Sequence, residues 1–305
     1  MPDIDVRTFL RADASALREI ALTALADGDL AGLTVQDIED WHDRLPADPE
    51  RTLVAVENDR VAGFFNPDYP LLIVARDRRR QRHGTRLVER ALARAETAGE
   101  PRLYLAPPVG NAASAAFATS LGFAYRSSLW QLRLPITVPT PPIEFPATVT
   151  TRTFHASDLA AYVRLINAAF ADHPSPIRVT EQSVRHVHGL AGFDPSHILL
   201  VAPFERPDAP IAFCRTVATF AAGITAGDVA LIGVLPEWQG RGIGRALLIW
   251  GIDHLRALAA ADITLTVEAR NQPALRLYER TGFVPVQEWP RWAKELPAEP
   301  PLPPL

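Results

Sequence analysis

The amino-acid sequence predicts two tandem α+β domains, each with a mixed β-sheet flanked by helices. Three observations lead to this fold class. The chain has 305 residues, about the length of two average domains. Its second half repeats positions of the first half in a constant register. In each half, the pattern predicts a series of strands followed by two β-α-β steps, which favours a mixed sheet over a purely parallel one.

The internal repeat indicates that a domain has been duplicated. Arg7-Thr8-Phe9 recurs as Arg152-Thr153-Phe154, 145 residues later. Further along, the distance becomes 160 residues, and the two copies then stay in register without a gap. The matches in this second register are Asp68, Leu71, Val74, Gly84, Leu87, Asn111, Gly122 and Phe123 with Asp228, Leu231, Val234, Gly244, Leu247, Asn271, Gly282 and Phe283. The second copy therefore carries about 15 additional residues in its middle.

Hydrophobic periodicity and capping residues predict the elements of the second copy. A strand opens at 151–154, and Ser157 can cap a helix that extends to about residue 171, because apolar residues recur there at helical spacing. Gly282 is suited to the position that closes the last helix. The remaining elements are a weaker helix at 180–190, strands at 197–202, 211–218 and 228–235, a helix at 242–258, a strand at 263–268, a helix at 271–281 and a strand at 283–287.

Two proline-rich segments delimit the predicted domains. Residues 135–147 hold five prolines, and residues 297–305 hold another five. Because this composition favours extended polyproline conformation and breaks helices, we expect the first segment to be a semi-rigid linker and the second to be a C-terminal tail. The predicted domains are therefore 1–134 and 148–296.

Composition excludes several classes of function. Hydrophobic residues make up 48% and charged residues 22%, as in ordinary globular proteins. The formal net charge of −4 lacks the basic excess of a nucleic-acid-binding protein, and no apolar run approaches the 18 residues of a membrane span. The first ten residues do not read as a signal peptide. We expect a cytoplasmic protein without nucleic-acid or membrane partners, monomeric because its two copies already form a pseudo-dimer.

A metal site is not expected. Cys214 is the only cysteine, which excludes an internal disulfide and a cysteine-based zinc cluster. His186 and His188 lie on a predicted helix, where side chains two residues apart point in different directions. For His173 and His197, a place on the substrate side and an ordinary surface or core position are both open.

A glycine-rich segment follows the strand at 228–235 and opens the next helix. At such a helix start, backbone N–H groups are unpaired, the helix dipole is positive, and glycines let a phosphate approach closely. The segment predicts a pyrophosphate site, with a tight ligand-free turn as the alternative. No Gly-Lys-Ser/Thr follows, and the third glycine of a dinucleotide fingerprint would fall on Leu247. What remains is Gln239-x-x-Gly242-x-Gly244.

A second motif occupies the last predicted helix. Asn271 suits its N-cap, Ala274 follows, and Tyr278 lies two turns along the same helix face as Asn271. Gly282-Phe283 closes the motif. Taken alone, Tyr278 is more consistent with a half-buried packing residue than with a functional one. The loop motif about 28 residues earlier favours the functional role.

Together, the two motifs resemble the signatures of the GCN5-related N-acetyltransferase (GNAT) superfamily. Its acetyl-CoA loop reads Arg/Gln-x-x-Gly-x-Gly/Ala, and its second signature is Asn, Ala, Tyr and Gly-Phe. The resemblance covers nearly the whole chain as two tandem copies. This layout is similar to that of the mycothiol synthases, which also resemble the chain at Asn167–Pro174 and at Phe193-Asp194-Pro195. It implies an N-acetyltransferase that moves acetyl from acetyl-CoA to a primary amine of a small molecule.

The resemblance also implies roles for individual residues. The family places the motif tyrosine, here Tyr278, beside the CoA sulfur, and it has a glutamate at the position of Asp228. The implied contacts with acetyl-CoA are Ile232, Val234, Leu235, Gln239, Gly240, Arg241, Gly242, Ile243, Gly244, Arg245, Asn271, Ala274 and Tyr278.

The chemistry of acetyl transfer calls for three kinds of group. A protonated amine must lose a proton to a base, and Asp228 and Glu268 are the candidates, unless they are solvated strand-end carboxylates. The developing oxyanion needs donors, and we consider the backbone N–H groups of 233–235, where Gly233 and Pro236 predict a bulge. The leaving thiolate, whose thiol has a pKa of about 8.5, gains from a proton donor, and Tyr278 fits this role.

The first copy departs from both motifs. Arg82 stands at the position of Gly242, and Ala118 stands at that of Tyr278. Because alanine cannot donate a proton, we expect the N-terminal domain to be inactive and the C-terminal domain to be catalytic. The sequence leaves three interpretations of the basic run Arg76–Arg86 open. It is a solvated face, a binding site for the CoA phosphates or a contact with nucleic acid. For the whole chain, the alternatives are a non-catalytic acyl-CoA-binding, sensing or scaffold protein, and transfer of an acyl group longer than acetyl.

Overall fold

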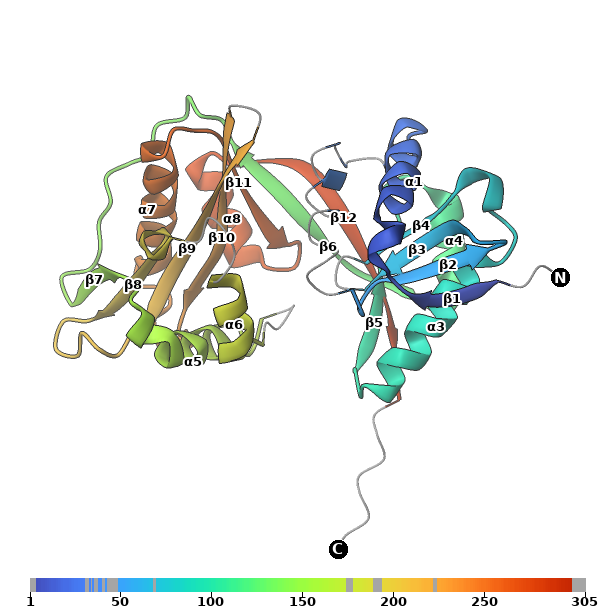
Figure 1. Ribbon diagram of the computed structural model, residues 1–305. Helices are drawn as coiled ribbons and strands as arrows, with labels where there is room; N and C mark the ends of the chain where they lie inside the picture. The colour runs from blue at the N-terminus through green and yellow to red at the C-terminus, as the bar shows by residue number, and fades with distance from the viewer. Residues whose placement is uncertain are drawn as a thin grey trace, which may run out of the picture. The chain divides into compact units, whose positions relative to one another are not determined.

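The chain forms two compact units (Figure 1). The computed structural model describes residues 4–30, 33, 35, 38–39, 42, 49–67, 70–173, 178–188, 194–221 and 224–297. Unit 1 contains Met1–Ser128 and Glu288–Leu305, and unit 2 contains Leu129–Gln287. Asp68, Pro174, Phe193 and most of the predicted tail lie outside the described residues.

The boundary between the two units falls inside two strands. β6 (Ala124–Leu134) starts in unit 1 and ends in unit 2, and β12 (Val284–Glu295) leads back to unit 1. The second part of β6 pairs with β11 (Ala260–Glu268) in unit 2, whereas the end of β12 pairs with β5 (Arg102–Leu105) in unit 1. Each unit is therefore completed by a strand that continues from the other. The cut points differ from the predicted boundaries at 134 and 148, which stay a prediction about the functional domains.

Unit 1 has an antiparallel sheet with helices on both faces. The strand order is β1 (Asp5–Thr8), β2 (Leu53–Glu57), β3 (Arg60–Asn66) and β4 (Leu71–Val74). The helices are α1 (Ala14–Ala26), α3 (His83–Thr97) and α4 (Ala112–Ser120). α1 packs on the face of Val54 and Phe64, and α3 packs on the face of Ala55 and Phe65. Successive residues of a strand point to opposite faces, so both faces are covered.

Unit 2 has a mixed sheet, which confirms the predicted fold class. The strand order is β7 (Val149–Thr153), β8 (Ile198–Pro203), β9 (Ala212–Ala221), β10 (Ile224–Val234), β11 and β6. β10 and β11 pair in parallel, and the other described pairs are antiparallel. The helices are α5 (Leu159–Ala169), α6 (Glu181–His188), α7 (Ile243–Ala257) and α8 (Gln272–Thr281). One core lies under α7 and α8 around Cys214, and another lies under α5 and α6 around Phe213.

Two strands are longer than predicted, and strand pairing gives the reason in each case. β10 starts at Ile224 instead of 228, because it pairs with β9 from Ala221 onward. β12 continues to Glu295 instead of ending at 287, because its second part completes unit 1. The other predicted elements of the second copy are present with ends shifted by a few residues.

The proline-rich segment 135–147 contains no helix or strand, but it is fixed on α7. Arg256 donates to the Val138 carbonyl and, at 3.0 Å, to Thr140 Oγ1. The Thr140 hydroxyl in turn donates to Asp253 Oδ1 at 2.7 Å. Val138 and Phe145 also pack against the core of unit 2. The predicted linker is thus a structured part of unit 2.

Both copies keep the same ion pair before their first helix. Arg7 bonds to the two carboxylate oxygens of Asp13 at 2.7 and 2.8 Å, and Arg152 bonds to those of Asp158 at 2.6 and 2.7 Å. Each aspartate also accepts a hydrogen bond from a backbone N–H three residues earlier. The repeated geometry supports the duplication inferred from the sequence.

We expect Asp158→Asn to lower the free energy of unfolding by about 1–3 kcal/mol, because hydrogen bonds to a charged group are lost. The hydrogen bond from Arg152 holds the pKa of Asp158 below its usual 3.8. A lowered folded-state pKa stabilises the fold above pH 3.8, and this contribution is lost as the pH falls through the folded-state value. Urea unfolding of wild type and Asp158→Asn should therefore differ at pH 7 and converge at low pH. A difference that is independent of pH would show that Asp158 acts through packing alone.

Candidate active site

Over its last residues, β10 is paired on one side only. It pairs with β9 as far as Val234, but its parallel pairing with β11 ends, within the described strands, at Asp228 opposite Thr264. A bulge interrupts the β9 side between Asp228 and Leu231, earlier than the predicted 233–235. The two parallel strands therefore separate beyond Asp228, and the β11-facing backbone groups of 229–234 lack strand partners.

The open edge of β10 offers backbone donors. Leu235 N–H donates to the Ile211 carbonyl at 2.9 Å, so it is already occupied. Because hydrogen-bonded pairs alternate along an antiparallel ladder, Gly233 N–H also points towards β9. The N–H groups of Ile232 and Val234 point to the opposite, open side. Of the backbone N–H groups predicted as oxyanion donors at 233–235, only that of Val234 is on the open side. The N–H group of Ile232, which the sequence does not predict as an oxyanion donor, is there as well.

The glycine loop leads into α7 without obstruction. Gly240 and Gly242 have φ angles of 73° and 84°, in the left-handed region that favours glycine. A Cβ at either position would meet no other described atom within 4 Å, and one at Gly244 would meet only Val234 Cγ2 at 3.8 Å. Gln239 Nε2 fixes the loop by donating to the Val234 carbonyl at 3.1 Å. The first N–H groups of α7 therefore face open space, as a phosphate site requires.

The side chains around the helix start differ in role. Arg241 stacks over the Trp238 ring, with its guanidinium carbon 4.6 Å from the ring centroid. Ile243 is buried in the core, so only its backbone is available to a ligand. Arg245 lies in the first turn of α7 and is exposed.

Asn271 and Tyr278 lie on α8 as the motif predicts. Asn271 Oδ1 accepts from Ala274 N–H at 3.3 Å and caps the helix. Tyr278 packs near Phe283, with ring centroids 6.0 Å apart. Burial raises the pKa of Tyr278, so its hydroxyl keeps its proton at neutral pH. That hydroxyl has no hydrogen-bond partner among the described residues, and it is available as a donor.

Asp228 is a half-buried residue at the point where the strands separate. It accepts a hydrogen bond from Thr264 Oγ1 at 3.1 Å. Burial raises the pKa of Asp228 to about 6, against the opposing effects of Thr264 and Arg215. Asp228 therefore lies at the last paired position of β10 and β11.

Glu268 lies apart from Asp228. It follows Thr264 by four residues on β11, about 13 Å along the strand. Its side chain is 1% exposed, and Arg270 Nε lies 3.6 Å from its Oε1. The two carboxyl groups are therefore not a proton-sharing pair, and the geometry favours Asp228 as the base.

His173 reaches the site through Asn271. The Asn271 amide donates to His173 Nε2 at 3.1 Å, and the His173 ring packs against Phe170. The sequence alone left open whether this histidine lines the substrate side, and the structure brings it to the start of α8. His197 instead packs edge-on against His254 of α7, 5.1 Å between centroids.

The loop of unit 1 keeps the path of its counterpart without the glycines. Arg80 and Arg82 have φ angles of 61° and 72°, at the positions of the two left-handed glycines of unit 2. Such a conformation costs a non-glycine residue about 1–2 kcal/mol. Arg79 Nε donates to the Val74 carbonyl at 3.1 Å, which matches the glutamine contact of unit 2. The backbone shape is thus preserved although the motif is lost.

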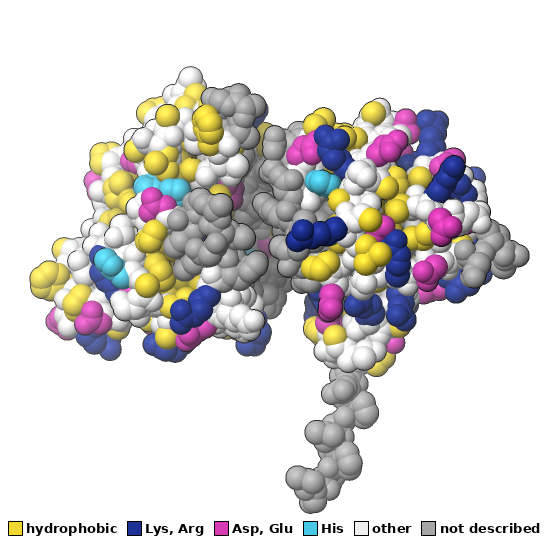
Figure 2. Space-filling view, viewed as in Figure 1, with side chains coloured by type: hydrophobic (Ala, Val, Ile, Leu, Met, Phe, Trp, Pro, Cys, Tyr) yellow, Lys and Arg dark blue, Asp and Glu magenta, His cyan; other side chains and the backbone are white. Residues whose placement is uncertain are grey.

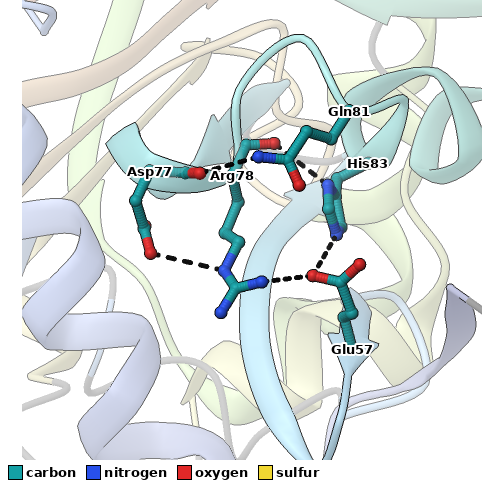
Figure 3. A network of polar contacts seen from close by, with 5 residues as sticks. All are labelled: Glu57, Asp77, Arg78, Gln81 and His83. Atoms are coloured by element: carbon teal, nitrogen blue, oxygen red, sulfur yellow. Dashed lines mark hydrogen bonds and ion pairs between the residues drawn. The ribbon is translucent and has the colours of Figure 1, made fainter. Parts of the chain in front are cut away.

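A closed polar network fixes this loop (Figure 3). Buried Glu57 pairs with Arg78 and lies 3.6 Å from His83 Nε2. His83 Nδ1 lies 3.0 Å from the Arg78 carbonyl oxygen, and Gln81 Nε2 donates to the Asp77 carbonyl at 2.8 Å. Gln81 and His83 therefore fix the backbone of the loop, and Arg78 and His83 tie it to Glu57 on β2.

Unit 1 also lacks the tyrosine and the open space of the second site. Ala118 is fully buried at the position of Tyr278. A Cβ at Gly84 would meet the Phe117 ring at 3.4 Å, whereas the corresponding space beside Gly244 is open. These contacts support the expectation that unit 1 is inactive.

The basic run of unit 1 is compensated by acidic residues. Arg76 lies 3.2 Å from Asp27, and Arg79 lies 2.7 Å from Asp29. On the face shown in Figure 2, the Lys and Arg side chains of this unit are interspersed with Asp and Glu. This pattern favours the interpretation as a solvated face.

The site combines three features: separated parallel strands, an open glycine loop at a helix start, and a tyrosine two helical turns beyond an asparagine N-cap. This combination defines an acyltransferase. The Acetyltransferase (GNAT) family model matches residues 15–123 and 163–283. A mycothiol acetyltransferase of Nocardia farcinica is 31% identical over 93% of this chain and 96% of the relative. One of Acidothermus cellulolyticus is 37% identical over 76% of each chain. The chain belongs to the GNAT acetyltransferase family, which confirms the resemblance drawn from the motifs.

Solved structures confirm the tandem fold. A GCN5-related N-acetyltransferase from Sphaerobacter thermophilus has a TM-score of 0.68 and 23% identity, covering 97% of this chain and 96% of that one. A tandem GNAT protein from the clavulanic acid biosynthesis pathway has a TM-score of 0.67 and 17% identity, covering 98% and 99%.

None of the helices among the described residues has the length and apolar character of a membrane span. Nor do three or more of their His, Cys, Asp and Glu side chains gather where a metal ion could be held. His186 and His188 lie on α6, and their side chains are outside the described part.

Proposed function

We propose that unit 2 transfers the acetyl group of acetyl-CoA to a primary amine of a small molecule, and that unit 1 is an inactive copy. One observation carries this proposal. β10 and β11 separate beyond the half-buried Asp228, the open start of α7 follows β10, and the Tyr278 hydroxyl on α8 has no partner among the described residues.

The open backbone groups support binding of acetyl-CoA in this unit. The N–H groups of Gly242–Arg245 suit the pyrophosphate, because they point out of the helix start. The N–H groups of Ile232 and Val234 suit the pantetheine arm and the thioester, because they line the unpaired strand edge. Asn271 and Ala274 form the N-terminal cap of α8, and Tyr278 lies further along the same helix.

The reaction follows from these groups. Asp228 accepts a proton from the acceptor ammonium, directly or through water, and its pKa of about 6 keeps it mostly ionised at pH 7. The amine nitrogen then forms its bond to the acetyl carbon while Val234 N–H donates to the carbonyl oxygen. The carbon–sulfur bond breaks, and Tyr278 gives its proton to the sulfur. The second proton of the attacking nitrogen then passes to the tyrosinate, directly or through water, which leaves a neutral amide and the CoA thiol, and Asp228 releases its proton to solvent.

The acceptor is proposed from the relatives. Proteins named mycothiol acetyltransferase match this chain at 31–37% identity. This supports the cysteinyl-glucosamine-inositol precursor of mycothiol as the first amine to test. We also propose that the enzyme is cytoplasmic and monomeric, the latter because its two copies supply both units in one chain.

The proposed function is tested by CoA release with a panel of amines that includes this precursor. Sustained turnover with one amine supports an N-acetyltransferase. Binding of acetyl-CoA without turnover on any amine would favour the alternative, a non-catalytic acyl-CoA-binding or sensing protein.

We expect Gly244→Val to weaken acetyl-CoA binding at least about tenfold, equivalent to about 1.4 kcal/mol, because the branched side chain stands where the pyrophosphate must approach. The fold should persist, since a Cβ there meets only Val234 Cγ2 at 3.8 Å. Calorimetry of binding, with thermal unfolding as a control, measures both effects. Gly244→Ala should give a smaller loss, and undiminished affinity in both variants would place the phosphates elsewhere.

A further inference from the structure

A second feature of unit 2 is an arginine on the sheet face opposite α7. Arg215 lies within β9, between Cys214 and Thr216. A Cβ at Gly251 of α7 would meet Cys214 Sγ at 3.1 Å and Thr216 Cγ2 at 3.4 Å, so both neighbours of Arg215 face α7. Because successive residues of a strand point to opposite faces, Arg215 lies on the face that carries α5 and α6. Its cross-strand partner Ile198 supports this placement, since Ile198 belongs to the core under these two helices.

Asp228, the proposed base, lies on the same face as Arg215. The residue before it, Gly227, faces α7, where a Cβ would meet Leu255 Cδ2 at 3.1 Å. Asp228 pairs with Val217 of β9, two residues beyond Arg215. Asp228 and Arg215 are therefore diagonal neighbours in an antiparallel pair, with Cα atoms about 7–8 Å apart, a separation that long side chains can bridge.

The guanidinium group of Arg215 has no hydrogen bond or ion pair within the part of the chain that the structure describes. Arg215 is half-buried, so water screens its charge only in part. Burial raises the pKa of Asp228 and that of Tyr162 on α5, and the positive charge of Arg215 opposes both shifts. A partly buried charge is costly to leave without a partner, and a ligand that supplies an anion removes this cost.

The first copy has a neutral residue at the corresponding position. β3 pairs with β4 as β9 pairs with β10, and Leu71 corresponds to Leu231 in the register of 160 residues. Arg215, the partner of Leu231, therefore corresponds to Asn66, the partner of Leu71. Asn66 is buried and donates to Thr52 Oγ1 at 2.8 Å. The copy that we expect to be inactive thus has a hydrogen-bonded amide where the proposed catalytic copy has an unpaired cation.

We propose that Arg215 binds a carboxylate of the acceptor, and that unit 2 acetylates amino acids and related small amines that carry a carboxyl group. The inference rests on the proposed function and names its substrate class. Such an acceptor presents an ammonium group and a carboxylate on one small molecule, which match the carboxylate of Asp228 and the guanidinium group of Arg215 on one face of the sheet. Arginine suits a carboxylate because its planar donors form two parallel hydrogen bonds with the two oxygens.

The test measures kcat/KM on the full chain for pairs of acceptors, each an amino acid and its primary amide. We expect wild type to prefer the amino acid by about 10–100-fold, the usual effect of hydrogen bonds between charged groups. Arg215→Gln should remove most of this preference, chiefly through a higher KM for the amino acid, and Arg215→Lys, which keeps the charge, should retain part of it. Arg206→Gln, at an exposed arginine in the turn after β8, should keep the wild-type preference. Thermal unfolding verifies the fold of each variant.

An effect of Arg215 on Asp228 alone would give a different pattern. Removing the positive charge raises the pKa of Asp228, so the pH below which kcat/KM falls should increase for both acceptors of a pair. A lost contact with the carboxylate changes the preference between the two acceptors, and this preference is measured above that pH. Comparing the preference between variants also cancels the different reactivity of the two amines.

Equal kcat/KM of wild type for the members of each pair would overturn this inference, and so would a preference that survives in Arg215→Gln. Turnover of the cysteinyl-glucosamine-inositol precursor, which has no carboxylate, with no turnover of any amino acid would overturn it as well. These results leave the proposed function standing, because an amine is still acetylated. Absence of turnover with every acceptor would overturn the proposed function together with this inference.

Discussion

Replacing Tyr278 by phenylalanine is expected to lower kcat by about 10²–10⁴-fold while acetyl-CoA affinity changes little, because general-acid help is lost. The ring that packs near Phe283 remains, and only the hydroxyl is removed. Burial raises the pKa of Tyr278, so the hydroxyl holds its proton until the thiolate leaves. Steady-state CoA release gives kcat, and a rapid-quench experiment establishes whether chemistry limits it.

The matched control for this variant is Tyr104→Phe. Tyr104 lies on β5 of unit 1, with the Arg291 guanidinium 4.1 Å from its ring centroid. It loses a hydroxyl outside the proposed site, so kcat should stay at the wild-type value. Ala118→Tyr should not create a second active site, because Ala118 is fully buried and a larger side chain there overpacks the core. Full activity of Tyr278→Phe with chemistry rate-limiting would remove Tyr278 from the mechanism.

Local sequence patterns predict the helices and strands around the site. They do not predict that β6 and β12 each run from one unit into the other. Gly242 and Asn271 mark helix starts by their own backbone and capping chemistry, and both helices begin within one residue of prediction. β6 carries apolar residues such as Leu132 and Leu134 that suit a buried strand in any sheet. Which strand lies beside it depends on contacts more than 120 residues away, at Ile263–Glu268. No local signal encodes that choice.

Within the site, sequence identified the groups but not their surroundings. The motif predicts the backbone N–H groups of Val234 and Leu235 as equally good donors. The structure distinguishes the two, because Leu235 N–H already donates to the Ile211 carbonyl. Asp228 and Glu268 were equivalent strand-end carboxylates until the structure paired Asp228 with Thr264 and set Glu268 beside Arg270. The prolines of 135–147 indicated a linker, while its attachment to Asp253 and Arg256 depends on tertiary packing.

The second large effect is expected at Asp228. Asp228→Asn should lower kcat/KM by about 10²–10⁴-fold, because an amide cannot take the proton of the acceptor ammonium. The raised pKa of Asp228, about 6, also predicts the pH dependence. Below that pH the carboxyl group is protonated and cannot act as a base, so wild-type kcat/KM should fall as the pH drops through about 6. In Asp228→Asn, this acidic limb should disappear from the residual activity.

Glu268→Gln is the matched control, since it makes the same chemical change about 13 Å further along β11. It should keep the acidic limb near pH 6 and lose less activity than Asp228→Asn. The two variants separate the roles because each removes one carboxylate and leaves the backbone of β10 and β11 unchanged. An acidic limb that vanishes in Glu268→Gln and persists in Asp228→Asn would transfer the base to Glu268, and the site would then centre on Asn271 and His173 at the start of α8.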